Sequence, residues 1–395
     1  MTIEIHPFSP EFLADPYPYF ERLHAEAPVF WNEPYGFWMI TKYDDVVAAA
    51  KNIKLFSSSA GPASGLVGGD SGQPSSIIAS DPPLHTRLRQ LVTMAFTPRR
   101  IAEMEPRIRE IAVGLLDDLQ AGTRPGGTFD MLEAFSAPLP VTVIAEILGA
   151  PAERHKEFKR WSDAAMGGAV PNAGDEVMKI VDEFQDYLTE LMDDRRAHPR
   201  NDPITGLVEA ADPESGKLTD EEIHQTILTI LVAGNETTTN LINNGVVQLA
   251  HHPETYQEVV KDPTLIPGLI EEVLRHHCPV QGIFRKATED VEIRGQTIHA
   301  GDHVWLLFGA AGRDAEHFTD PGRFDIHRQP NDHIGFGFGI HFCLGAPLAR
   351  LEGRIAFEEI LARLPELSLG PEEPVMFPAP IVHGYSKLPL TMGGG

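Results

Sequence analysis

The sequence predicts a mainly helical fold with small β-sheets (α+β), which we expect to form one domain of 395 residues. Apolar residues at helical spacing fill much of residues 80–278 and 346–364. Short alternating apolar segments, which are typical of strands, gather instead at about 1–56 and 280–310. No Pro/Ser-rich linker divides the chain, and its apolar content is ample for one large core.

Composition excludes several classes of protein. The chain has 32 Lys+Arg against 57 Asp+Glu, a formal net charge of −25, which argues against a nucleic-acid partner. Its only cysteines, Cys278 and Cys343, exclude a disulfide framework, and no Cys-x-x-Cys-His indicates covalent haem attachment. Residues 1–7 lack a basic segment followed by an apolar run, and no stretch approaches the ~20 apolar residues that span a bilayer. We therefore expect a soluble, cytoplasmic protein with no membrane partner.

The first part of the chain predicts a helix, a hairpin and a second helix. The helix covers 17–25, the two strands cover 29–31 and 36–40, and the second helix covers 43–51. Residues 57–78 are rich in Ser, Gly and Pro, and such a long irregular stretch is either a solvated loop or a functional one.

A helix with two basic side chains on one face follows this loop. Asp81 can cap the helix, because the prolines after it suit a first turn. His85 and Arg89 are four residues apart, so they share one helix face. Such a pair suits a ligand with two carboxylates, although a solvated basic face is the simpler alternative.

Residues 101–119 and 141–149 read as core helices. Two more helices, at 153–166 and 175–196, are joined by the glycine-rich segment 167–174.

A long helix opens with the capping box Thr219–Glu222 and runs over 223–249. Its centre contains Ala233, Gly234, Glu236 and Thr237, with a run of three threonines that costs helix stability. The two small residues would let a flat cofactor approach the backbone. Glu236 could relay protons, and the Thr237 hydroxyl could bind oxygen. The alternative is a salt-bridged Glu and a Thr bonded to the preceding turn.

Glu272 and Arg275 can pair on one face of the next helix. Cys278 lacks any ligand context and reads as an inert core thiol. Short strands follow at 280–285, 291–293 and 304–307.

Cys343 lies among glycines and aromatics just before a helical pattern. These neighbours are Phe336, Gly337, Phe338, Gly339, Phe342 and Gly345. The helix dipole favours a thiolate there, and backbone N–H groups could tune its electron donation to a metal. A small buried Cys in a glycine-rich turn is the simpler alternative.

This stretch resembles the haem-binding loop of the cytochrome P450 family, Phe-x-x-Gly-x-x-x-Cys-x-Gly. Phe336, Gly339, Cys343 and Gly345 fill its four fixed places, and the Ala-Pro-Leu-Ala-Arg run that follows is similar to the soluble bacterial branch. The segment 233–238 resembles the family's Ala-Gly-x-(Asp/Glu)-Thr-Thr pattern. Glu272 and Arg275 resemble its Glu-x-x-Arg, and Pro321-Gly322-Arg323-Phe324 its Pro-x-Arg-Phe.

The resemblance implies a triangular helical prism around a buried haem b. Cys343 would be the axial ligand of the iron, which favours O–O cleavage. The propionates would be held by His85, Arg89, Arg285 and His341, while Ala233, Gly234, Phe336, Gly339 and Gly345 would also contact the haem. Thr237 and Glu236 would form the acid–alcohol pair that supplies protons to oxygen, and Arg323 would join Glu272 and Arg275 in a structural network.

The resemblance also places the substrate. The loop 57–78 would contact it, with Leu66 and Val67 as apolar candidates, and 160–180 would form a mobile lid. Residues 280–284 and the turn 380–384 would border the same space. His383 is either a polar substrate contact or a solvated turn residue.

The expected activity is that of a haem-thiolate monooxygenase, an oxidoreductase that hydroxylates or epoxidises a hydrophobic small molecule with O₂. Electrons would come from NAD(P)H through a separate ferredoxin or flavodoxin and its reductase. A basic patch near Cys343 would receive this partner, made by Arg99, Arg100, Arg107, Arg350 and Arg354. Two alternatives remain, a peroxide-driven oxidase and a non-catalytic haem protein that binds a small ligand. The acid–alcohol pair argues against both.

Overall fold

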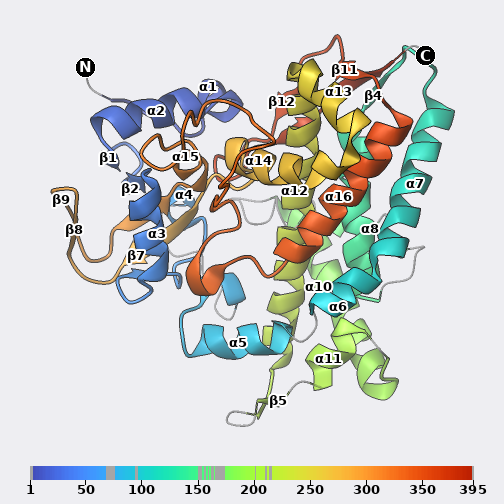
Figure 1. Ribbon diagram of the computed structural model, residues 1–395. Helices are drawn as coiled ribbons and strands as arrows, with labels where there is room; N and C mark the ends of the chain where they lie inside the picture. The colour runs from blue at the N-terminus through green and yellow to red at the C-terminus, as the bar shows by residue number, and fades with distance from the viewer. Residues whose placement is uncertain are drawn as a thin grey trace.

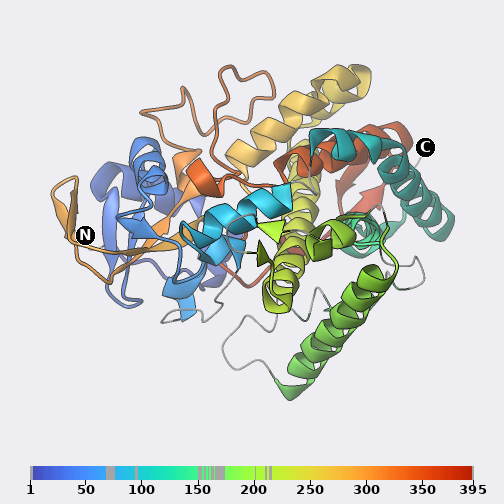
Figure 2. The ribbon, with the colours of Figure 1, turned by 90° about the horizontal axis from the view of Figure 1, so that it is seen from below.

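The fold is arranged around one long helix, α12 (Asp220–His251). A computed structural model describes residues 3–67, 76–93, 97–149, 154, 157–158, 160–161, 164, 174–200, 202–209, 211–212 and 216–393. In Figure 1, α12 runs through the middle of the molecule, with the N-terminal helices and the largest sheet on one side and α7, α8 and α16 on the other. Figure 2 shows the same division from below.

Helices make up most of the described chain. They are α1 Pro10–Ala14, α2 Tyr17–Glu26, α3 Tyr43–Lys51, α4 Ser64–Val67, α5 Leu84–Thr93, α6 Pro98–Glu103, α7 Glu105–Gly122, α8 Pro138–Ile147, α10 Asp175–Ala197, α11 Pro203–Glu209, α12, α13 Pro253–Lys261, α14 Ile266–His276, α15 Phe308–Ala311 and α16 Ala346–Arg363. Short 3₁₀ turns lie at Ile77–Ala79, Pro263–Leu265 and Gly339–His341, and a π-helical turn at Leu132–Ser136.

Small sheets complete the α+β fold. The strands are β1 Val29–Asn32, β2 Phe37–Ile40, β3 Phe56–Ser57, β4 Thr128–Asp130, β5 Ala211–Asp212, β6 Gly216–Lys217, β7 Ile283–Ala287, β8 Val291–Ile293, β9 Gln296–Ile298, β10 His303–Leu306, β11 Leu367–Leu369, β12 Val375–Met376, β13 Tyr385–Lys387 and β14 Pro389–Met392. The five-stranded sheet has the order β1-β2-β10-β7-β3, so it joins the two regions that the sequence predicts to be strand-rich. A three-stranded sheet has the order β11-β14-β4.

Local sequence signals explain where α12 begins. The Thr219 hydroxyl accepts from the Glu222 N–H (3.2 Å), and the Glu222 carboxylate accepts from the Thr219 N–H (2.9 Å), which completes the predicted capping box. Leu231, Leu241, Ile242 and Leu249 are buried in the largest apolar cluster, so the middle and end of the helix pass through the core.

The elements that the sequence predicts near the N-terminus are confirmed, and one prediction at α5 is corrected. The helix at 43–51 and the hairpin of β1 and β2 lie where the sequence places them. The Asp81 carboxylate, however, does not cap α5, because it accepts hydrogen bonds from the Ser58 N–H (2.9 Å) and the Ser57 hydroxyl. Most of the predicted helix 153–166, the segment 165–173 and the loop residues 68–75 lie outside the described residues.

Glu272 and Arg275 form a buried ion pair on α14. Both side chains are 0% exposed, and two hydrogen bonds of 2.7 and 2.8 Å join them. The sequence placed the Arg323 side chain beside this pair, but only the Arg323 carbonyl takes part, accepting from Arg275 (3.0 Å). The guanidinium of Arg323 turns outward to Asp325, and Arg328 lies beside Glu272 instead (3.4 Å).

No helix among the described residues is both long enough and apolar enough to cross a bilayer.

We predict that Arg275→Ala lowers the free energy of unfolding by about 3–5 kcal/mol, because it removes the cation that makes both ion-pair hydrogen bonds to a fully buried carboxylate and leaves only the more distant Arg328. Arg323→Ala is the matched control, since that guanidinium is 65% exposed and should change stability by no more than about 0.5 kcal/mol. Urea denaturation of both variants measures the difference. Equal losses would show that the Arg323 side chain belongs to the network after all.

Candidate active site

Cys343 lies in an irregular loop immediately before α16. Its N–H donates to the Phe336 carbonyl (2.9 Å), which folds the loop back on itself. Gly339 has φ +70° and lies against α3, so a Cβ there would be only 3.1 Å from the Ala50 carbonyl oxygen. Cys343 is exposed on one side, yet enough protein surrounds it that burial raises the pKa of its thiol. The N–H groups of Gly345 and Ala346 oppose that rise.

Basic side chains from three separate segments meet near this loop. The rings of His85 on α5 and His341 lie 4.3 Å apart, and His341 Nε2 lies 2.9 Å from the Ser58 hydroxyl. Arg285 on β7 is buried, and it donates to the Phe284 carbonyl (2.8 Å). His85 Nε2 is buried and has no partner among the described residues.

These groups destabilise one another's charged forms. Burial and then the charges of Arg285, His85 and Arg89 lower the pKa of His341 to about 3. Burial lowers the pKa of Arg285 to about 10, and burial and then Arg89 lower the pKa of His85. No carboxylate in the described part of the chain pairs with Arg89 or Arg285. A bound anion would therefore stabilise this cluster.

Two contacts to α12 hold α5, and with it His85 and Arg89, in this position. Arg87 pairs with Glu222 at the start of α12. The Ser76 hydroxyl, just before the 3₁₀ turn that leads to α5, lies 3.1 Å from the Thr229 hydroxyl, which is one helical turn before Ala233 on α12. The sequence did not predict either contact, because each depends on which helix packs against α5.

The centre of α12 presents small and polar residues to an accessible face. Ala233 is exposed and Thr237 half-buried, whereas Leu231 and Asn235 beside them are buried. Gly234 packs on α8, where a Cβ would lie 3.3 Å from Ile144. The Thr237 hydroxyl donates to the Ala233 carbonyl (2.6 Å), so the back-bonded alternative describes this structure. Its oxygen remains free to accept a hydrogen bond.

The residues present fit a haem of the kind that the resemblance implies. The thiol of Cys343 would hold the iron, and the basic cluster would hold two carboxylates. The orphaned His85 Nε2 and the uncompensated Arg285 are the donors that such carboxylates need. Ala233 leaves space for a flat group on the accessible face of α12, whereas Gly234, which was predicted to contact the haem, faces Ile144 on α8 instead.

The two segments expected to border the substrate do come together. Val280 and Val382 form a β-bridge, and the Gln281 N–H donates to the Ile381 carbonyl (2.8 Å). For His383, the structure decides against one of the two alternatives. It is buried among aromatic rings, 5.8 Å from Tyr17 and 5.9 Å from His277, so it is not a solvated turn residue. Val67 has no described side chain, and Leu66 packs in the apolar cluster around Phe284.

The sequence analysis missed Glu352, a buried carboxyl group on α16. Burial raises its pKa to about 8, a rise that the neighbouring Thr238 hydroxyl opposes, and its Oε1 has no partner among the described residues. The signal was available, because Glu352 lies between Leu348 and Ile355 on the apolar face of the helix. An acid in an apolar stripe indicates a buried, uncharged carboxyl group.

Comparison with known proteins gives one consistent family. Residues 14–374 match the model of the family described as cytochrome P450. The monooxygenase PikC of Streptomyces venezuelae is 38% identical and covers 100% of this chain and 95% of its own. The vitamin D(3) 25-hydroxylase of Pseudonocardia autotrophica is 39% identical over 98% of this chain and 96% of its own. The structure of cytochrome P450 CYP109Q5 from Chondromyces apiculatus has a TM-score of 0.90 and 40% identity over 100% and 99% of the two chains.

We predict that Glu352→Gln stabilises the protein at pH 7–8 but not at pH 4–5. The folded pKa of about 8 exceeds the ordinary 4.5, so the folded state binds more protons between these values and stability falls as pH rises through that window. Gln stays neutral and escapes this loss, a gain of up to about 3 kcal/mol at pH 7. Thermal melts of both proteins from pH 5 to pH 8 measure it.

Glu359→Gln is the control for this prediction, because Glu359 is buried on the same helix but is paired with Arg109 and Arg363. It should lose stability and show no gain as the pH rises. A Glu352→Gln curve parallel to wild type would mean that Glu352 is ionised in the folded protein.

Proposed function

The chain belongs to the cytochrome P450 family, and we propose on this basis that it inserts one oxygen atom of O₂ into a C–H or C=C bond of a hydrophobic small molecule. The family's monooxygenases carry a haem iron and use O₂ and redox partners. The chain is thus an oxidoreductase of that kind. Haem b as the specific cofactor, NAD(P)H through a ferredoxin or flavodoxin and its reductase as the electron source, and the substrate class are our proposals.

One observation carries this proposal most directly. An accessible thiol and a cluster of buried bases without a counter-anion lie on segments that are far apart in the sequence. The basic cluster does not stabilise the chain by itself, because an unpaired buried cation such as Arg285 raises the free energy of the folded state. A haem with two carboxylates would satisfy both at once.

The proposed roles of the chain's own residues follow from their positions. When bound, the haem supplies the oxidising chemistry, with the thiolate of Cys343 as electron donor to its iron. His85, Arg89, Arg285 and His341 would orient it through its carboxylates. The Thr237 oxygen, held by its bond to Ala233, would accept a hydrogen bond from a proton donor beside the reacting oxygen, and Glu236 would deliver protons.

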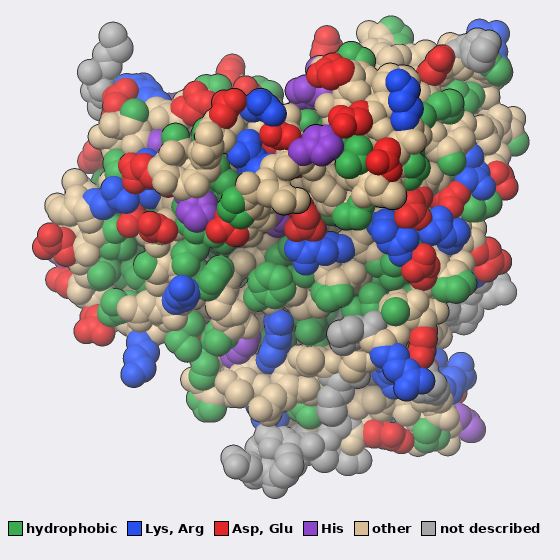
Figure 3. Space-filling view, in the orientation of Figure 1, with side chains coloured by type: hydrophobic (Ala, Val, Ile, Leu, Met, Phe, Trp, Pro, Cys, Tyr) green, Lys and Arg blue, Asp and Glu red, His purple; other side chains and the backbone are tan. Residues whose placement is uncertain are grey.

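The redox partner would meet a surface that is less basic than the sequence indicated. Arg107, Arg350 and Arg354 pair with Glu146, Glu271 and Glu105 respectively. Figure 3 likewise shows acidic and basic side chains intermixed over this side of the molecule. Ile340 and Phe342 beside Cys343 are exposed, so we propose an apolar contact with few free charges at the docking site.

Apolar residues around the predicted substrate space support the proposed substrate class. Leu66, Val280 and Ile381 are apolar and partly buried around the predicted substrate space. One relative that matches 98% of this chain is a vitamin D(3) 25-hydroxylase, so at least one similar protein hydroxylates vitamin D(3). We propose a hydrophobic substrate without a carboxylate anchor, because burial lowers the pKa of His383 to about 4 and leaves no cation on the turn 380–384 at neutral pH.

We predict that Cys343→Ser abolishes the thiolate Soret band of the ferrous–CO complex and the monooxygenase activity together, because serine is a far weaker electron donor. Cys278→Ser is the control, since that thiol is buried, bonded to the Val280 carbonyl (3.0 Å), and kept protonated by a pKa of about 12. It should retain the band. A thiolate band that survived in Cys343→Ser would overturn the ligand assignment.

We predict that Thr237→Ala keeps the ferrous–CO band but lowers the product formed per electron about tenfold or more, with the balance released as hydrogen peroxide. Thr189→Ala is the matched control, because that exposed hydroxyl on α10 also bonds to the carbonyl four residues back (3.0 Å). It should remain coupled. Wild-type turnover on peroxide alone would favour the peroxide-driven alternative.

A further inference from the structure

The start of the loop 57–78 is joined to all three segments that carry the basic cluster. The basic cluster consists of His85, Arg89, Arg285 and His341. Strand β3, at the start of the loop, pairs with β7, which carries Arg285. The Ser58 N–H donates to the carboxylate of Asp81 (2.9 Å), three residues before α5 begins. The Ser58 hydroxyl lies 2.9 Å from His341 Nε2. The loop start therefore meets the cluster from three sides.

A single carboxylate organises this turn of the loop. Besides the Ser58 N–H, the Asp81 carboxylate accepts from the Ser57 hydroxyl, and the Ser57 oxygen accepts from the Ser59 N–H (3.0 Å). Ser57 and Ser58 are 7% and 1% exposed, so little solvent reaches these two side chains. Hydrogen bonds to a charged acceptor are short and strong, so Ser58 has a defined position against His341.

The His341 ring can bond to Ser58 and to a haem carboxylate at the same time. An imidazole ring has two nitrogens, which point in different directions. Nε2 is directed at the Ser58 hydroxyl, which leaves Nδ1 for a carboxylate. The bond to Ser58 restricts rotation of the ring and so fixes the direction of Nδ1. Ser58 therefore acts on a carboxylate donor without contacting the carboxylate.

Asp81 also acts on the basic cluster through its charge. Burial lowers the pKa of Arg285 to about 10, and the charge of Asp81 opposes that fall. Burial and then Arg89 lower the pKa of His85, which Asp81 likewise opposes. A carboxylate so placed would compete with a haem carboxylate for these bases. Its hydrogen bonds to the loop hold it back and leave the bases available.

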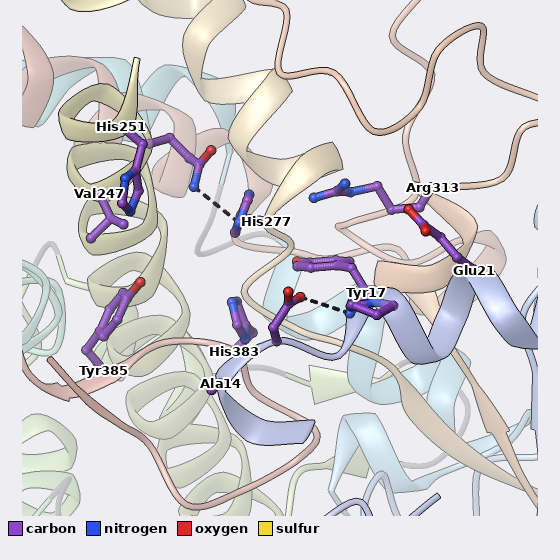
Figure 4. Close-up of a pocket in the computed structure, with 12 residues that line it drawn as sticks. Ala14, Tyr17, Glu21, Val247, His251, His277, Arg313, His383 and Tyr385 are labelled. Carbon is purple, nitrogen blue, oxygen red and sulfur yellow. Dashed lines mark hydrogen bonds between the residues drawn. The ribbon is translucent and has the colours of Figure 1, made fainter. Parts of the chain in front are cut away.

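The turn 380–384, which is also expected to border the substrate, is anchored elsewhere. Figure 4 shows His383 of this turn beside Tyr17 and His277, and the ring centroids lie 5.8 and 5.9 Å from that of His383. The His383 N–H donates to the Pro279 carbonyl (2.8 Å). None of these partners belongs to the basic cluster. The turn is therefore an internal reference for effects that are specific to the loop start.

We propose that Ser58 and Asp81 are positioning residues that couple the substrate-facing loop to the haem carboxylates through His341. The proposal rests on the proposed monooxygenase function, in which the haem and the contact between this loop and the substrate are both expected. Such coupling is reciprocal. Displacing the loop start therefore weakens the hold on the haem, and a bound haem steadies the loop start.

The test compares Ser58→Ala with Ser59→Ala in the haem-loaded protein. Ser59 is the matched control, because its exposed hydroxyl bonds to the Ser57 hydroxyl (2.7 Å) within the loop. Ser58→Ala should speed the transfer of haem to apomyoglobin, and the amide hydrogen exchange of residues 57–62, each about fivefold, the effect of losing one hydrogen bond. Ser59→Ala should leave haem transfer unchanged. In both variants the turn 380–384 should exchange at the wild-type rate.

A double-mutant cycle with His341→Ala separates positioning from local stability of the loop. If Ser58 acts through His341, Ser58→Ala should not speed haem transfer further in the His341→Ala background. Asp81→Ala should match Ser58→Ala. Asp81→Asn should restore wild-type amide exchange, because its carboxamide oxygen still accepts from the Ser58 N–H.

Two results would overturn the coupling. One is additive losses in the double-mutant cycle, and the other is equal haem transfer in Ser58→Ala and Ser59→Ala. A wild-type protein without the thiolate ferrous–CO band would instead refute the monooxygenase function itself. The two ideas therefore fail in distinguishable ways.

Discussion

Two neighbouring carboxylates on α14 hold the irregular segment that carries Cys343. Glu272 binds Arg275, accepts from the Asp325 N–H (2.8 Å) and lies beside Arg328. Glu271, one residue earlier, binds His333 and Arg350 on either side of the cysteine. Because burying a carboxylate is costly unless several donors surround it, the position of these donors is tightly restricted. The loop thus gains a fixed shape from ion pairs rather than from secondary structure.

The sequence predicted those features that short-range patterns determine. The capping box of α12, the hairpin of β1 and β2, and the inert Cys278 depend on neighbouring residues and on burial alone. Family motifs added the set His85, Arg285 and His341, which the structure brings together in part through the 4.3 Å ring contact. What failed was the choice among distant partners. The Asp81 carboxylate turned to Ser58, Arg328 replaced the Arg323 side chain, and His383 joined a buried ring cluster. Several partners suit each of these groups equally in sequence, and only tertiary packing selects one.

The electrostatics of the site and of the rest of the molecule are opposed. The chain has a net charge of −25, and most arginines on its helices are paired with acids. Arg89 and Arg285 depart from this pattern, because no carboxylate in the described part of the chain pairs with either of them. Arg285 is also buried. A sequence with so many carboxylates could have paired it, so an uncompensated cation here indicates a place kept for an external anion. The same reasoning explains the orphaned His85 Nε2.

Buried polar side chains also lie along α12, which carries asparagines where a core helix would normally carry leucines. Asn240, Asn243 and Asn244 are all buried, yet within the described part of the chain only the Asn244 side chain is hydrogen-bonded, to carbonyls of two neighbouring segments. Replacing paired amides by apolar residues of similar size is often neutral, so stability alone does not require them. Asn244 has a structural reason, because it ties the C-terminal turn to the helix. The carboxamide of Asn240 packs directly against Gly384 of the same turn, so these two asparagines together fix how the turn lies on the helix.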